Sequence, residues 1–170
     1  SVADTTIPVF EGVEKTKTFF VGEVADSQIY VIPDVTIDTS TIRVRVYDSA
    51  NSLTFTTYTN ITQAIRITND STFYQIKEVP NGYYEIIFGD GISSGKAPIA
   101  GNKVVIDYLS TTGTAANGAA TFSTTATISI DGSSYAVNAT TSNAAAGGAY
   151  KESIESIRQN APIAFSSQRR

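Results

Sequence analysis

The sequence predicts a mainly β protein of the α+β kind, with antiparallel sheets in a sandwich-like arrangement, several hairpins and one C-terminal helix. Three observations support this prediction. The chain has 170 residues, of which 41% are hydrophobic and 16% charged, which is enough apolar material for a core. Several segments alternate apolar and polar side chains with the period of two that is typical of half-buried strands. Only one segment, close to the C-terminus, has clear helical spacing.

The central prediction concerns residues 83–108, which read as two strands joined by a long glycine-rich loop. We expect the two strands to pair antiparallel with Glu85 opposite Asp107, because their apolar faces then meet. The two carboxylates would share the other face, so a nearby cation should offset their repulsion. The candidate cations are Lys103, Arg43 and Arg45. The apolar side chains that would meet are Tyr84, Ile86 and Phe88 with Tyr108, Ile106 and Val104.

Other strands are predicted before this stretch from alternation and from turn residues. Residues 41–47 alternate most clearly, with Ile42, Val44 and Val46 facing inward, and the polar run after them predicts a hairpin loop. The sequence Pro80-Asn81-Gly82 predicts a tight turn. Residues 61–67 fit a short helix or irregular connection as well as a strand, and we favour the former. The remaining strands are expected at 16–24, 28–32, 53–58 and 72–79.

The second half of the chain begins with a Thr, Gly and Ala-rich loop, followed by a predicted hairpin. Asp131-Gly132 between residues 121–130 and 135–140 is a strong hairpin signal. A loop of two or four residues places Ile128 and Ile130 on one face with Tyr135 and Val137, whereas a loop of three would break that face. Two strands alone are marginal in water, so this hairpin should need a neighbour.

The predicted helix spans residues 150–160, with Tyr150, Ile154 and Ile157 on one stripe and Pro162 at its end. We expect this stripe to pack against sheet or against a partner chain. The predicted organisation is therefore a β domain over 1–114, a hairpin insertion over 115–148 and a helix with its tail over 149–170. The chain starts with Ser1, lacks Met and ends in Arg169-Arg170, so we expect it to be a piece of a longer polypeptide.

Composition argues against several functions. The chain has neither Cys nor His, which removes thiolate chemistry, the Ser-His-Asp triad and the commonest metal ligand. A net charge of −4 with scattered basic residues argues against nucleic-acid binding, and no apolar run is long enough to span a membrane. We therefore expect no catalytic centre, no metal, no cofactor and no small-molecule substrate.

Four patterns nevertheless suggest chemistry, and each has a simpler interpretation. Gly89-Asp90-Gly91 could bind phosphate or calcium, but a tight turn is favoured because no helix or further carboxylate follows. Glu85 and Asp107, with Glu78 nearby, could form a glycosidase pair, but sheet-surface carboxylates are common. Arg43 and Arg45 could hold a phosphate, although arginines on a strand are more often salt-bridged. The nine Tyr and eight Phe could stack on sugars, but most alternate within strands as core residues would.

The order of several short motifs resembles that of the baseplate J-like family of contractile-tailed phages. The first block is YEIIFGDG (84–91), GNKVV (101–105), Tyr108, Gly113 and ANG (116–118). The second is AAGG (145–148), ESI (152–154), IR (157–158), AP (161–162) and RR (169–170). A third block, QIYVIPD (28–34) with IDTSTIRV (37–44), is similar to the inner baseplate wedge subunit of T-even-like phages. The family continues beyond the Arg-Arg position, and simpler members have a shorter connection where residues 121–140 stand here.

The resemblance implies structural work in the virion, after assembly in the host cytoplasm. Such subunits pair with copies of themselves and with other baseplate wedge proteins, without catalysis or cofactor. A receptor- or glycan-binding β-module is the alternative function, and a glycosidase domain a third. The resemblance assigns structural roles to Phe88, Gly89, Asp90, Gly91, Gly101, Asn102, Tyr108, Gly147, Gly148, Glu152, Arg158 and Pro162. The hairpin and helix offer Ile128, Ile130, Tyr135, Val137, Tyr150 and Ile154 as expected subunit contacts.

Overall fold

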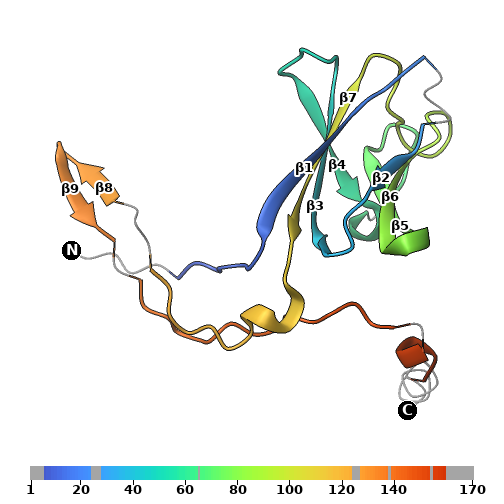
Figure 1. The fold of residues 1–170 in the computed structure, drawn as a ribbon. Coiled ribbons are helices and arrows are strands. Elements are labelled where there is room, and N and C mark those ends of the chain that lie inside the picture. Colours follow the sequence, from blue (N-terminus) through green and yellow to red (C-terminus); the bar gives the residue numbers. More distant parts are fainter. Residues whose placement is uncertain are drawn as a thin grey trace. The chain divides into compact units, whose positions relative to one another are not determined.

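The structure is a computed structural model that describes residues 6–23, 28–64, 66–123, 127–137, 139–153 and 155–159. The chain divides into two compact units, residues 1–111 and residues 112–170. We call the first unit the body and the second the arm, and Figure 1 shows the strands of both.

The body is built on one seven-stranded sheet with the strand order β1-β7-β3-β4-β5-β6-β2. Neighbouring strands pair antiparallel except for β4 and β5, which are parallel over a short stretch. The strands are β1 (Val13–Phe20), β2 (Tyr30–Ile32), β3 (Ile37–Tyr47), β4 (Phe55–Asn60), β5 (Phe73–Val79), β6 (Tyr83–Phe88) and β7 (Lys103–Ser110). The predicted mainly β, mostly antiparallel fold is confirmed.

The predicted pairing of the strand at 83–88 with the strand at 103–108 is wrong. In the structure β6 pairs with β5 and β2, while β7 pairs with β1 and β3. The tight turn Pro80–Gly82 joins β5 to β6 with Asn81 and Gly82 at positive φ, and such a local hairpin forms more readily than one across the long loop at 89–102. The inward faces were predicted correctly, since Ile86 and Ile106 are both buried.

The core lies between the two halves of this sheet. Ile32 and Ile86 come from the β5-β6-β2 half, and Val44, Val104 and Ile106 come from the β3-β7 part. Aromatic rings link the halves, because Phe19 of β1 contacts Tyr30 of β2 although these strands lie at opposite ends of the strand order. The sheet therefore curls, and its concave side is filled by side chains.

Other local predictions hold with shifted boundaries. Residues 48–54 join β3 to β4 in the predicted hairpin, so β4 begins two residues later than expected. Ile42, Val44 and Val46 are buried as expected. The ambiguous segment starts with a short 3-10 helix, η2 (Ile61–Gln63), which Asn60 caps by accepting from the Thr62 amide. The third strand is longer than predicted and carries a bulge between Asp38 and Arg43.

The arm contains a 3-10 helix, η4 (Gly113–Ala116), and the strands β8 (Thr127–Ile130) and β9 (Ser133–Ala136). Ile130 pairs with Ser133, so the predicted hairpin has the two-residue loop Asp131-Gly132, with both residues at positive φ. A helix covers residues 155–159. The predicted helix began at Tyr150, but residues 150–153 are not helical. Ile154 and Pro162 lie outside the described residues.

Candidate protein-interaction site

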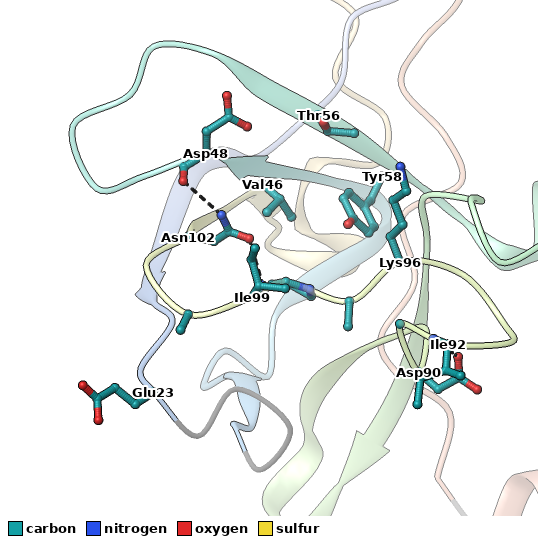
Figure 2. Close-up of a pocket in the computed structure, with 14 residues that line it drawn as sticks. Glu23, Val46, Asp48, Thr56, Tyr58, Asp90, Ile92, Lys96, Ile99 and Asn102 are labelled. Carbon is teal, nitrogen blue, oxygen red and sulfur yellow. Dashed lines mark hydrogen bonds between the residues drawn. The ribbon is translucent and has the colours of Figure 1, made fainter.

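The loop at 89–102 borders a hollow of about 790 Å³ beside the ends of β3 and β4. Figure 2 shows Val46 and Tyr58 on the strand side of this hollow, with Ile92 and Ile99 on the loop side. Ile92 is 83% exposed and Ile99 is 67% exposed, so the loop presents apolar side chains to solvent. Glu23 and Asp48 add negative charge to the lining. The hollow thus has the mixed apolar and charged character of a protein contact surface.

Asp90 holds the first half of the loop in shape. Its Oδ1 accepts hydrogen bonds from the backbone amides of Ile92, Ser93 and Ser94 at 2.8–2.9 Å, and its Oδ2 accepts from the Ser93 hydroxyl at 2.6 Å. These donors, led by the Ser93 hydroxyl, lower the pKa of the Asp90 carboxyl well below its usual range. Both oxygens are engaged within the loop, so the predicted tight turn fits this geometry better than a calcium ligand.

Glycine is required at two positions of the same loop. A Cβ on Gly89 would lie 2.3 Å from the carbonyl oxygen of Ser94. Gly95 has φ +77°, and a Cβ there would lie 2.3 Å from the ring of Phe73. The loop is therefore packed on the body rather than free above it. This packing explains why Gly89 and Gly95 must be glycine, while Asp90 fixes the turn between them.

Asn102 closes the second half of the loop. Its side-chain oxygen accepts from the Ile99 amide at 2.9 Å, and its Nδ2 donates to the carbonyl of Asp48 at 3.1 Å. Its own carbonyl accepts from the Val21 amide at 2.9 Å. Asn102 therefore joins the loop to the β3–β4 hairpin and to the end of β1, and it fixes one wall of the hollow in Figure 2.

The candidate carboxylate pair is not brought together by strand pairing. Glu85 lies on β6, opposite Lys77 of β5, with 4.0 Å between the Lys77 Nζ and a carboxylate oxygen. Asp107 lies on β7, where it forms an ion pair with Arg45 and accepts a hydrogen bond from Thr16. Arg45 was one of the cations expected beside Asp107, and this contact is confirmed. Because β6 and β7 are not neighbours, the register that suggested an acid–base pair does not exist.

Asp34 is a buried carboxylate that the sequence showed only as the last residue of the motif QIYVIPD. Its Oδ2 accepts from Lys15 at 2.8 Å, and its Oδ1 accepts from the amide and hydroxyl of Thr36. Burial alone would raise the pKa of Asp34, but hydrogen bonds from Lys15, Thr36 and Ser110 together lower it. The spacing Asp34-x-Thr36, which is typical of an Asx turn, is the signal that could have revealed it. The group ties β1 to the start of β3.

Two segments of the arm, residues 117–119 and 145–148, are held together by backbone hydrogen bonds and by the side chain of Asn117. Asn117 accepts from the amide of Gly148 at 2.9 Å and donates to its carbonyl at 2.8 Å. Beside it, Gly118 donates to Ala145 and Ala145 donates to Ala119, both at 2.8 Å. A Cβ on Gly148 would lie 2.3 Å from the carbonyl oxygen of Gly113. Two motif blocks that are separate in the sequence, 116–118 and 145–148, thus meet in the structure.

The expected contact residues of the arm are mostly exposed. Ile128 pairs with Tyr135 across the hairpin, as the predicted face requires, and both are about half exposed together with Ile130. Val137 is partly buried, Tyr150 is 70% exposed and lies against Gly113, and Ile157 is 50% exposed. Among the other motif residues, Tyr108 is buried in the body, Arg158 is exposed, and Glu152 accepts from the Ser156 hydroxyl.

Comparison with known proteins adds no identification. No protein-family model matches the chain, and no curated protein matches its sequence. Within the described ranges, no cluster of three or more acidic, His or Cys side chains is arranged to hold a metal ion. Likewise, none of the helices in the described part of the chain is long and apolar enough to cross a membrane.

Proposed function

We propose that this chain is a structural subunit of the tail baseplate of a contractile phage. In this role it helps to build the inner wedge ring around the hub and relays the rearrangement of that ring to sheath contraction. It binds copies of itself and other wedge proteins, in the virion and in the host cytoplasm during assembly. It requires no catalysis, metal or cofactor.

The observation that carries this proposal is the shared order of three motif blocks along most of the chain. The geometry of the motif residues supports a structural interpretation of these blocks. The side chains of Asp90 and Asn102 form hydrogen bonds that hold the loop at 89–102, and the side chain of Asn117 bonds to Gly148. Residues used in this way shape surfaces rather than carry out chemistry.

The division into two units also suits this role. A ring that rearranges needs stiff bodies that meet at surfaces able to repack. The curled sheet, with its fully buried Ile86 and Ile106, provides a stiff body. The exposed loop side chains Ile92 and Ile99, and the apolar side of the arm hairpin, provide surfaces for neighbouring subunits.

Sedimentation of the chain, alone and mixed with wedge proteins encoded beside it, tests the proposal. We expect a monomer or weak dimer alone and a stable complex in at least one mixture, because permanent subunit interfaces bury upwards of about 2,000 Å². The matched variants are Ile92→Ser, which changes an exposed loop residue, and Leu53→Ser, which changes a residue that is 91% exposed on the β3–β4 hairpin. We expect Ile92→Ser to weaken the complex and Leu53→Ser to leave it intact.

A chain that stays monomeric in every mixture yet binds a glycan would overturn the scaffold proposal in favour of the binding module. Glycan binding of that kind needs exposed aromatic rings beside polar groups. The partly exposed ring pair of Tyr47 and Phe55 is the place to look, although Lys103 and Arg45 already lie against these rings.

A further inference from the structure

A second hollow of the body, of about 680 Å³, lies beside the bulge of β3. Its walls come from β3, β4 and η2, which supply Thr39, Thr57 and Gln63 respectively. Within the described part of the chain, the side chains of these three residues form no hydrogen bond. Hydroxyl and amide groups that are left without partners favour a polar ligand.

Arg43 of β3 supplies a positive charge to this hollow. In the register of β3 with β7 it lies opposite Asp107. The Asp107 carboxylate is already engaged, because its Oδ2 pairs with Arg45 and its Oδ1 accepts from the Thr16 hydroxyl at 2.7 Å. Arg43 is exposed, and its side chain forms no ion pair or hydrogen bond with any described residue. Of the two arginines that the sequence suggested for holding an anion, Arg45 is therefore engaged and Arg43 is available.

The charges around Arg43 favour a ligand with a single negative charge. Glu14 of β1 lines the same hollow, so two arginines face two carboxylates and their formal charges cancel. A carboxylate adds one negative charge, and its two oxygens match the parallel N–H groups of a guanidinium. A phosphate carries nearly two negative charges and is repelled more strongly by Glu14 and Asp107. The site is therefore better matched to a carboxylate than to a phosphate.

The floor of the hollow favours a protein ligand over a sugar. Tyr58 and Tyr74 line it, but they are only 6% and 3% exposed. The Tyr74 hydroxyl is also engaged, since it donates to the carbonyl of Ile42 at 2.9 Å. Neither ring therefore offers the open face on which a sugar would stack. Arg43, in contrast, is exposed on a strand, where a group on the surface of another protein can reach it.

We propose that Arg43 and the polar walls of this hollow bind a carboxylate of a partner protein, either an acidic side chain or a chain terminus. The guanidinium donates two parallel hydrogen bonds to the carboxylate, and Thr57 and Gln63 bind the adjoining peptide groups. The source of the carboxylate rests on the proposed function, since we expect it on a neighbouring subunit. The binding test, however, uses this chain alone.

Three tripeptides that differ in one carboxylate test the site. Gly-Glu-Gly with both ends blocked carries a side-chain carboxylate, Gly-Gln-Gly with both ends blocked carries none, and Gly-Gln-Gly with a free C-terminus carries a terminal one. Nuclear magnetic resonance follows the Arg43 side-chain N–H and the backbone amides of Thr57 and Gln63 during titration. We expect saturable shifts from a peptide with a carboxylate and none from the peptide without one. The absence of saturable shifts with both carboxylate peptides would overturn the proposal.

Two matched variants assign the binding to Arg43. Arg43→Gln and Arg66→Gln each remove one positive charge from an exposed arginine, but Arg66 does not line the hollow. We expect Arg43→Gln to weaken binding of the carboxylate peptide about tenfold and Arg66→Gln to change it less than about twofold. Glu14→Gln should strengthen binding and reduce the preference for this peptide over inorganic phosphate, because it removes a repelling charge. Equal losses in the two arginine variants would show unspecific charge attraction and overturn the site.

Other ligands and the subunit mixtures test the source of the carboxylate. Tighter binding of glucuronate than of either carboxylate peptide would overturn a protein source in favour of an acidic sugar. Tighter binding of inorganic phosphate by the unaltered chain would overturn the choice of a carboxylate. In the mixtures with wedge proteins, Arg43→Gln should weaken the complex several-fold, and a complex of unchanged strength would overturn a neighbouring subunit as the source. If all mixtures fail while the peptides bind through Arg43, the proposed function fails and the carboxylate site stands.

Discussion

The body and the arm reach order by different physical means. The body buries a core of aliphatic and aromatic side chains and carries 21 charged residues among its 111. In the arm none of the described residues is buried, and residues 112–150 contain one charge. The arm is shaped by backbone pairing, positive-φ turns and the Asn117 contact with Gly148. The arm therefore has no core of its own, and its surface over residues 112–150 is almost uncharged. Such a surface is better suited to contact with other protein surfaces than to contact with water.

The largest expected difference comes from matched isoleucine substitutions. Ile86→Ala in the body removes a side chain that is 1% exposed, whereas Ile130→Ala in the arm removes one that is 55% exposed. We expect Ile86→Ala to lower the free energy of unfolding by about 2–5 kcal/mol. Ile130→Ala should change it by less than about 0.5 kcal/mol. Urea denaturation followed by circular dichroism measures both, and equal losses would mean that the arm shares the body's core.

Glycine substitutions sharpen the same contrast. Gly95→Ala places a Cβ against the ring of Phe73 at a residue with φ +77°, while Gly132→Ala meets open space at φ +80°. The first change combines overpacking, typically about 1–3 kcal/mol, with backbone strain of about 1–2 kcal/mol. Gly132→Ala introduces backbone strain without overpacking, and this strain is confined to the arm hairpin. The body's denaturation midpoint should therefore fall for Gly95→Ala and stay unchanged for Gly132→Ala.

Sequence periodicity predicted the inward face of a strand better than the neighbours of that strand. Ile42, Val44 and Val46 were assigned correctly because alternation fixes which side chains share a face. Alternation says nothing about which strand lies alongside, so β6 and β7 were paired wrongly and the parallel contact of β4 with β5 was missed. Local turns were more reliable, since Asp131-Gly132 and Pro80–Gly82 both join the strands they flank.

The candidate site shows the same limit. Asp90 and Asn102 were found through motif order, but their roles depend on contacts with Ser94 and with the distant Asp48. The contact of Asn117 with Gly148 joins residues 31 apart, which no local pattern specifies. Tyr30 is similar, because nothing in its sequence surroundings indicates that its hydroxyl is buried without a hydrogen-bond partner in the described structure.

Two tyrosines in the body's core allow a buried hydroxyl without a hydrogen-bond partner to be compared with one that has a partner. The hydroxyl of Tyr30 is buried and unpaired among the described residues, whereas that of Tyr74 donates to the carbonyl of Ile42 at 2.9 Å. Tyr30→Phe should raise the free energy of unfolding by about 1 kcal/mol, because it removes a buried polar group that lacks a partner. Tyr74→Phe should lower it by about 1–2 kcal/mol, because the carbonyl loses its donor. Two changes of the same sign would contradict this assignment of partners.

The same tyrosine predicts sensitivity of the body to alkali. Burial, with a smaller contribution from Tyr58, raises the pKa of Tyr30 from 10.0 to about 12. A raised folded-state pKa means that the hydroxyl ionises more easily in the unfolded chain than in the folded one. The free energy of unfolding is therefore unaffected by this group below pH 10 and falls as the pH rises from 10 towards 12. Unfolding midpoints measured between pH 8 and pH 12 should fall, and they should fall less steeply for Tyr30→Phe. Identical pH profiles for the two proteins would exclude Tyr30 as the cause.

The smallest expected effect on the body comes from removing the tip of the arm. Residues 122–139 are replaced by an Asn-Gly turn, which leaves the paired segments at 117–119 and 145–148 in place. The body should keep its denaturation midpoint, because in the described structure its core cluster draws only on residues of the body. The deletion should instead weaken the complexes with wedge proteins that the proposed function requires, because it removes the exposed side chains of Ile128, Ile130 and Tyr135. Analytical ultracentrifugation of the intact and the shortened chain, each mixed with the wedge proteins, measures this loss. Loss of the body's cooperative transition would show that the hairpin contributes to the core, and the distinction between body and arm would no longer hold.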